Sequence, residues 1–216
     1  MVIRHLKPRF ATGGIELDVG CLHKVRVLLV EDKLNSANII IDEIMKDERL
    51  DCVGFATDQA SGVKAACRFL PDIVTLDLHA ACNCHDGIET AKEIRLKTNA
   101  RIIFLAGAEH RGIMYEACIK AFASGYIFKS QAHDHDIADS IFDAATQETP
   151  LKLAFQRIVR DALTPAQLFV LDSLIAGNIE ALGYSSSKTI ANHKTIIFKK
   201  LGLKSEKELL HVFRNW

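Results

Sequence analysis

The chain has 216 residues, of which 49% are hydrophobic and 25% are charged, and its formal net charge is zero. The length suits one large domain or two smaller ones, and the composition is that of an ordinary soluble protein. No apolar run reaches the ~18 residues that a membrane-spanning helix needs, so we expect no membrane partner. The first residues, MVIRHLKPRFATGG, lack the apolar core of a signal peptide, so we expect a cytoplasmic protein with reduced thiols.

The charges are distributed unevenly along the chain. From Pro150 onward there are ten Lys and Arg against five Asp and Glu, while the preceding part has seventeen against twenty-two. A basic tail behind an acidic front suggests a C-terminal part that faces nucleic acid.

The front part alternates short apolar runs with amphipathic stretches, which predicts strands and helices in turn. The expected strands are Val25–Val30, Cys52–Ala56, Ile73–Leu76, Arg101–Leu105 and Tyr126–Phe128. The expected helices lie near Leu34–Lys46, Gln59–Leu70, Gly87–Lys97, Arg111–Phe122 and Asp136–Thr146. This order is typical of an α/β fold, a doubly wound five-stranded parallel sheet with helices on both faces.

Charged residues collect where these strands end. Glu31 and Asp32 follow the first strand, Asp77 ends the third and Lys129 ends the fifth. Because ligands of open parallel sheets bind at the carboxyl ends of the strands, we expect the four side chains to share one site. Three carboxylates suit Mg²⁺, and the ammonium supplies a point charge for an anion. The alternative is that each acidic residue only caps a helix. Capping is a fair explanation of any single position, but a poor explanation of all four positions together.

This constellation resembles the CheY-like, flavodoxin-like receiver domain of two-component response regulators over roughly residues 24–147. By that resemblance Glu31 and Asp32 are the acidic pair, Asp77 accepts the phosphoryl group and Lys129 is the invariant lysine. HDGIE at 85–89 fits the Asp-Gly stretch that opens the next helix, and ASGYIFKS at 123–130 fits the segment ending in the lysine. The resemblance implies a sensor histidine kinase as phosphoryl donor and Mg²⁺ as cofactor.

Two features depart from that family. Ala106 stands where the family usually has Ser or Thr, whose hydroxyl hydrogen-bonds the phosphoryl group. A methyl group cannot donate that bond, so the usual coupling from the phosphate to the switch aromatic, Tyr126, is interrupted. The loop LHAACNCHDG after Asp77 is about two residues longer than usual and carries two thiols and two imidazoles, at His79, Cys82, Cys84 and His85. These are plausible soft-metal or redox groups, although Cys-x-Cys is not the usual zinc spacing. The alternative is a merely variable loop.

Behind the front part, residues 148–163 look like a linker. Pro150 interrupts the preceding helix. Leu153, Ile158 and Leu163 form an intermittent apolar face, so a short helix within the linker is an open alternative. A helix is then expected from a Thr164 cap and Pro165 up to a stop at Gly177. A second helix is expected behind a serine cap at 185–187, ending at Gly202.

The tail from Leu163 to Leu210 resembles the LuxR-type (NarL/FixJ-like) helix-turn-helix, through LTP, KTIANH and KKLGLKS. By that match the DNA-facing candidates are Lys188, Ala191, Asn192, Thr195 and Lys199. Asn192 is the best candidate for a base contact, because Asn can bond adenine in a bidentate manner. Only NIEA separates AG from LG, so we expect the scaffold helix to shrink to about one turn.

The sequence therefore predicts an extension at 1–23, a receiver domain at 24–147, a linker at 148–163 and an all-α helix-turn-helix domain at 164–216. We expect a DNA-binding transcriptional response regulator rather than an enzyme, whose phosphorylation controls DNA binding. By the resemblance it acts as a homodimer, pairing through 206–213, on a pseudo-palindromic promoter site. The alternative is an atypical receiver that acts through protein contacts or through the Cys/His loop, independently of phosphate.

Overall fold

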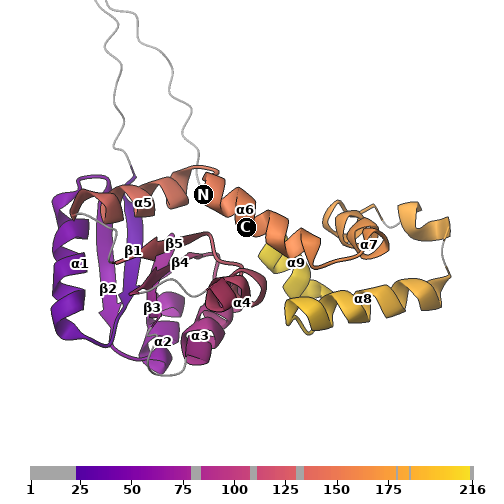
Figure 1. The fold of residues 1–216 in the computed structure, drawn as a ribbon, viewed down its shortest axis with the longest axis horizontal. Coiled ribbons are helices and arrows are strands. Elements are labelled where there is room, and N and C mark those ends of the chain that lie inside the picture. The colour runs from indigo at the N-terminus through magenta and orange to yellow at the C-terminus, as the bar shows by residue number, and fades with distance from the viewer. Residues whose placement is uncertain are drawn as a thin grey trace, which may run out of the picture.

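The computed structural model describes residues 23–78, 84–107, 111–129, 134–178, 180–184 and 186–214. Its first part is a parallel sheet in the order β2-β1-β3-β4-β5 (Figure 1). The strands are β1 (Val25–Val30), β2 (Leu50–Ala56), β3 (Ile73–Leu78), β4 (Arg101–Ala106) and β5 (Gly125–Phe128). The order reverses between β1 and β3, as a doubly wound sheet requires, so the predicted fold is confirmed.

Helices cover both faces of this sheet. They are α1 (Leu34–Lys46), α2 (Gln59–Phe69), α3 (Cys84–Lys97), α4 (Arg111–Ala121) and α5 (Asp134–Thr146). One apolar core joins α1 and α5 to the sheet, and a second joins α2, α3 and α4 to its other face. Because both faces are covered, a strand such as β1 is apolar at almost every position rather than at alternate ones.

The second part contains only helices and their connections in the residues that the structure describes. It comprises α6 (Pro150–Asp161), α7 (Pro165–Ile175), the 3₁₀ helix η1 (Glu180–Tyr184), α8 (Ser187–Leu201) and α9 (Glu206–Arg214). The local signals for α7 are confirmed: Thr164 forms a capping box with Gln167, and Pro165 takes the first helical position. The scaffold helix is reduced to η1, as expected. No described helix is both long and apolar enough to span a bilayer.

The segment predicted as a linker is mostly the helix α6. Thr149 accepts a hydrogen bond from the backbone N–H of Lys152, and Pro150 begins the helix, so the proline that ends α5 also starts α6. The expected apolar face was partly wrong, since Leu153 is exposed while Phe155 and Val159 are buried. Phe155 packs into the core formed by the sheet with α2, α3 and α4, and Val159 packs into the core of the C-terminal helices. Helix α6 therefore joins the two cores. In Figure 1 it runs from the part with the sheet toward the other C-terminal helices.

Candidate acidic site at the sheet edge

Glu31, the first of the four predicted site residues, lies directly after β1. Its backbone N–H continues the sheet by donating to the carbonyl of Ala56 at 3.0 Å. The side chain is 0% exposed. Burial raises the pKa of Glu31, and the hydrogen bond from Lys129 acts in the opposite direction. A buried carboxylate of this kind needs a cation beside it in order to stay charged.

Asp77 lies within the last two residues of β3, one residue further inside the strand than the sequence suggested. The strand continues to Leu78 because Asp77 and Leu78 still pair with Leu105 and Ala106 of β4. The Asp77 side chain is only 5% exposed. Its carboxylate is thus held at a fixed point on the sheet edge rather than on a loop.

Lys129 follows β5 and bridges the two buried carboxylates. Its ammonium lies 2.6 Å from Glu31 Oε2 and 2.7 Å from Asp77 Oδ1. Its backbone N–H donates to the carbonyl of Ala106 at 2.8 Å, which fixes the end of β5 against β4. The lysine comes from the far side of β4 in the sheet order, so only the tertiary fold brings it to β1 and β3.

Asp32 completes a group of three carboxylates and is exposed to solvent. One oxygen from each of Glu31, Asp32 and Asp77 lies within 4.8 Å of the others. Opposite ligands of an octahedral Mg²⁺ ion are about 4.2 Å apart, so a set of this spacing and chemistry suits such an ion. The structure therefore brings together all four residues that the sequence assigned to one site, while their roles stay predictions.

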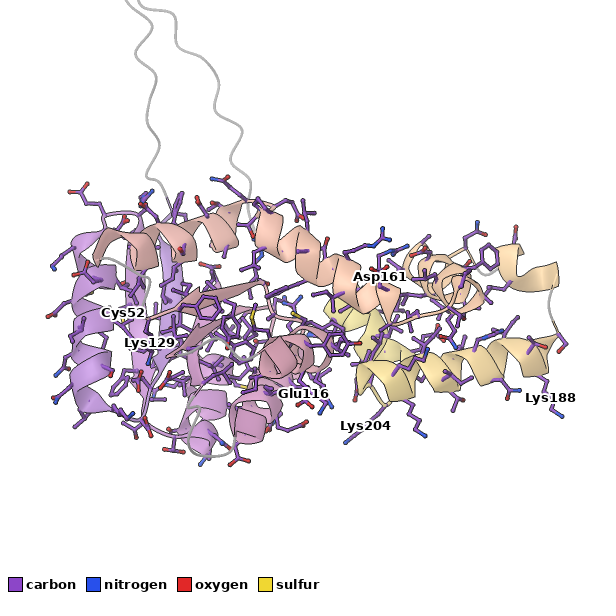
Figure 2. The ribbon with its side chains drawn as sticks, viewed as in Figure 1. Cys52, Glu116, Lys129, Asp161, Lys188 and Lys204 are labelled. Carbon is purple, nitrogen blue, oxygen red and sulfur yellow. The ribbon has the colours of Figure 1, made fainter. Side chains whose placement is uncertain are left out.

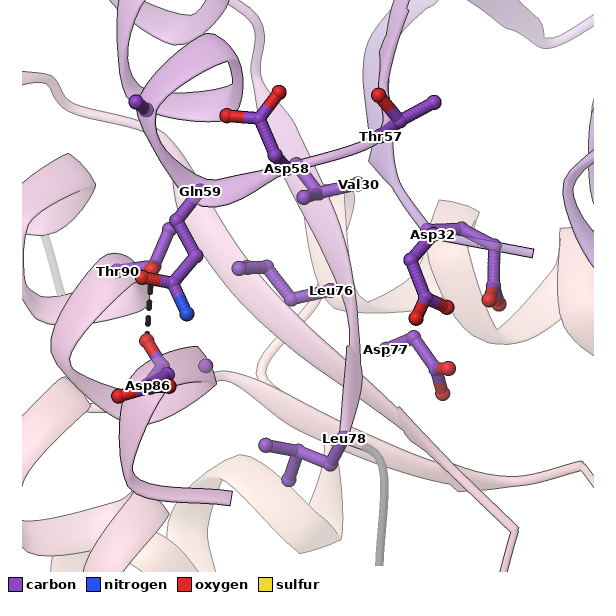
Figure 3. A pocket seen from close by; sticks show the side chains of 13 residues that line it. Val30, Asp32, Thr57, Asp58, Gln59, Leu76, Asp77, Leu78, Asp86 and Thr90 are labelled. Carbon is purple, nitrogen blue, oxygen red and sulfur yellow. Dashed lines mark hydrogen bonds between the residues drawn. The ribbon is translucent and has the colours of Figure 1, made fainter. Parts of the chain in front are cut away.

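The acidic group lines a pocket of about 470 Å³. In Figure 3, Asp32 and Asp77 stand on one side of this pocket, and Asp86 and Thr90 of α3 stand on the other. Thr90 donates to the carbonyl of Asp86 at 2.7 Å. Gly87 lies between them, where an added Cβ would come within 3.0 Å of the Leu78 side chain. This close approach gives the Asp-Gly stretch a physical reason.

Sequence reasoning missed the wall of the pocket formed by Thr57, Asp58 and Gln59. These residues follow β2, so the rule that located the other strand ends would also have found them. Asp58 also caps α2, since its side chain accepts a hydrogen bond from the backbone N–H of Ser61.

Ala106 and Tyr126 lie beside the site rather than in the pocket. Ala106 is buried at the end of β4, between Leu78 and Phe128 of the neighbouring strands. Tyr126 is buried in the core, with its ring centroid 6.4 Å from that of Phe104 and 5.1 Å from that of Phe128. In this conformation the predicted switch aromatic is turned inward.

The Cys/His loop stays untested. His79 and Cys82 lie outside the described residues. Cys84 and His85 form the start of α3, which begins three residues before the predicted Gly87, but their side chains are outside the described part of the chain. A metal or redox role of this loop therefore stays a prediction.

The DNA-facing candidates lie together on α8. Lys188, Asn192, Thr195 and Lys199 recur at spacings of three or four residues, so they share one face of the helix, and Ala191 borders it. All five are exposed. Figure 2 shows Lys188 at the end of α8 that is far from Lys129 and the sheet. The opposite face of α8 is anchored by Ile197 and Leu201, which are buried in the C-terminal core.

Comparisons with known proteins match the front of the chain to a family and most of the chain to two regulators. Residues 27–141 match the family model described as the response regulator receiver domain. The nitrate/nitrite response regulator protein homolog of Haemophilus influenzae is 25% identical over 196 residues, which cover 84% of this chain and 92% of that protein. The transcriptional regulatory protein LiaR of Bacillus subtilis is 28% identical over 195 residues, or 82% and 90% of the two chains.

Other matches are partial or show the fold alone. The chain spans 31% of a protein-glutamate methylesterase of Geobacter sulfurreducens, at 29% identity over 54% of its own length. The receiver domain of NarL from Mycobacterium tuberculosis aligns with a TM-score of 0.52 at 24% identity, covering 56% of this chain and 96% of that one. The RcsB–DNA complex aligns with a TM-score of 0.51 at 21% identity, covering 89% of this chain and 99% of that one.

Proposed function

The chain belongs to the response regulator receiver family, and on this premise we propose that it is a two-component transcriptional regulator with a phosphoryl-accepting Asp77 and a DNA-binding C-terminal part. The observation that carries the proposal is the contact of Lys129 with both Glu31 and Asp77 beside an exposed Asp32. Support for the DNA-binding half comes from relatives that are named as regulators and align along most of both chains.

In the proposed reaction, a carboxylate oxygen of Asp77 bonds to the phosphorus of a phosphohistidine on the sensor kinase. The phosphorus–nitrogen bond breaks, and its electron pair stays with the imidazole. Lys129 already lies 2.7 Å from Asp77, so it is placed to neutralise the oxygens of the transferred group. Glu31, Asp32 and Asp77 would hold Mg²⁺, which when bound would neutralise further charge on those oxygens.

The phosphate half is tested with beryllium fluoride, a phosphoryl mimic, and Mg²⁺. We expect both to bind to the wild-type chain, and we expect the mimic not to bind to Asp77→Asn, which has the same shape but lacks the negative charge. Calorimetric titration measures both. Equal binding by the two chains would show that the mimic does not use Asp77.

The DNA half rests on the exposed face of α8. A bidentate contact from Asn192 to adenine would contribute about 1–3 kcal/mol of base discrimination. We therefore expect Asn192→Ala to reduce binding to a site selected from random duplexes by about tenfold or more, measured by gel retardation. Asn38→Ala changes an exposed asparagine on α1 and is the matched control. Equal losses in both variants would reject this docking.

The proposed homodimer would pair through α9 on a pseudo-palindromic site. In this conformation Leu209 and Val212 of α9 are buried within the chain. Pairing through that helix would therefore require α9 to leave its present neighbours.

A second candidate function is an atypical receiver that works through protein contacts without phosphate. The buried methyl group of Ala106 favours it, since this side chain can donate no hydrogen bond to a phosphoryl group. The two candidates differ in the beryllium fluoride titration, because only the first requires the acidic site to bind the mimic.

A further inference from the structure

Helix α8 exposes one large apolar side chain, Ile196, which is 42% exposed. The other exposed side chains of α8 are small or polar: Ser187, Lys188, Thr189, Ala191, Asn192, Thr195, Lys199 and Lys200. The next residue, Ile197, is 0% exposed and packs with Leu201 into the core of the C-terminal helices. The packing that holds α8 in place therefore uses Ile197 and leaves Ile196 at the surface.

Ile196 lies beside Asn192, the candidate for a base contact. Four residues make about 40° more than one turn of an α-helix, so the two side chains are neighbours one turn apart. The exposed positions of α8 run around the helix from Ala191 to Lys200, and both side chains lie within that arc. At 1.5 Å per residue, the rise from Asn192 to Ile196 is about 6 Å. Along a DNA duplex this distance is about two base pairs.

The two neighbours offer different chemistry to a base edge. Asn192 carries an amide that both donates and accepts, whereas Ile196 carries only methyl and methylene groups. Thr195 adds little hydrogen bonding to this face, because its hydroxyl donates to the carbonyl of Ala191 within the helix at 3.0 Å. The face therefore combines one amide with one large apolar group.

The major groove contains one apolar group that such a side chain can recognise. This group is the C5 methyl of thymine. Cytosine presents an amino donor in its place, and an apolar side chain against that donor would leave it without a hydrogen-bond partner. An isoleucine on the groove-facing side of α8 thus favours thymine over cytosine.

We propose that Ile196 contacts the C5 methyl group of a thymine in the major groove, within about two base pairs of the adenine bonded by Asn192. Helix α8 then selects a site in which an adenine and a thymine stand close together. The inference rests on the proposed function, because it requires this face of α8 to enter the groove.

The full-length chain and a duplex selected from random sequences test the contact. Uracil replaces thymine at one position at a time, which removes only the methyl group. We expect the wild-type chain to bind about fourfold more weakly when the contacted thymine is replaced, as the exposure of one methyl group implies. Ile196→Ala should bind the thymine duplex more weakly and show no further loss with uracil at that position. Gel retardation measures all four affinities.

Two further variants separate the contact from a loss of folding. Ile196→Val keeps a branched apolar side chain and should keep most of the uracil effect. Ile39→Ala changes an isoleucine of α1 that is 61% exposed, and it is the matched control, with the affinities of the wild-type chain. Since Ile196 lies at the surface, Ile196→Ala and Ile39→Ala should unfold at similar urea concentrations. A much earlier transition in Ile196→Ala would assign this side chain to packing and overturn the contact.

The outcomes distinguish this inference from the proposed function. The contact is refuted if Ile196→Ala stays as sensitive to uracil as Ile39→Ala, or if the wild-type chain is indifferent to every replacement. In both cases Asn192→Ala still decides whether α8 docks in the groove. Selection of no duplex by the wild-type chain would reject the DNA half of the proposed function and the thymine contact together.

Discussion

Replacing Lys129 by Met removes the charge that bridges Glu31 and Asp77 while keeping much of the aliphatic side chain. The two carboxylates are 0% and 5% exposed, so the substitution leaves two nearby negative charges with little solvent around them. Breaking a buried ion pair by removing one partner typically costs about 3–5 kcal/mol. Protonation of Glu31, whose pKa is already raised, offsets part of that cost. We therefore expect the free energy of unfolding to fall by about 3 kcal/mol without metal.

The same substitution should strengthen Mg²⁺ binding. The ammonium and the ion compete for the same carboxylates, and charges of one and two units about 6 Å apart repel by about 1.4 kcal/mol even in water. Loss of the ammonium should thus tighten Mg²⁺ binding by about tenfold or more. An ion at about 100 times its Kd would in turn restore about 2.7 kcal/mol of stability.

Urea denaturation with and without Mg²⁺ measures the stability, and calorimetric titration measures the affinity. Lys120→Met is the matched control, because Lys120 pairs with Glu116 at 3.3 Å on the surface, where such a pair contributes at most about 1 kcal/mol. The reasoning is refuted if Lys129→Met is as stable as Lys120→Met without metal, or if its Mg²⁺ affinity is unchanged or weaker.

Two further predictions concern stability and thiol chemistry. Leu70 is exposed and has a left-handed backbone with a φ of +47°, which glycine adopts more easily than leucine. Leu70→Gly should therefore raise the free energy of unfolding, measured in urea, by about 1 kcal/mol. Leu153→Gly, at an exposed position inside α6, should lower it by a similar amount, because glycine is unfavourable within a helix. Burial raises the pKa of Cys118 to about 12, so its thiol should stay protonated at pH 8. It should therefore resist iodoacetamide until the protein unfolds, while the exposed Cys67 reacts. Peptide mass spectrometry measures the labelling, and equal labelling of the two thiols in the folded protein would contradict this. Since the folded pKa of Cys118 lies above the unfolded one, its contribution to stability should be lost as the pH rises from the ordinary thiol range toward about 12.

Local signals located most of the elements. The limits of β1 and α1 agree with the predicted ones, and the ends of the other front elements differ by no more than three residues. Disagreement is largest at α3, which starts at Cys84, three residues before the predicted Gly87, and β3 continues through Asp77 to Leu78, two residues beyond its predicted end. Strand ends are set by pairing with β4, and a sequence pattern carries no information about that pairing.

The location of the acidic site was predictable because the carboxyl ends of parallel strands lie along one edge of the sheet. Glu31, Asp77 and Lys129 each stand at a strand end, so the rule places them together without knowledge of side-chain contacts. The burial of Glu31 and the shared ammonium were not predictable, since they depend on how three strands and their helices pack.

The sequence by itself determined the alternation of strands and helices, the caps of α7 and α8, and the face of α8 that carries Asn192. Each of these depends on residues that are near one another in the chain. Only the tertiary structure decided that α6 joins two cores, that Arg95 holds the end of α9 across 117 residues, and that Phe122 is strained beside it. The physical reason is that such contacts depend on which surfaces of distant elements meet, and their free energy appears only once those elements have packed.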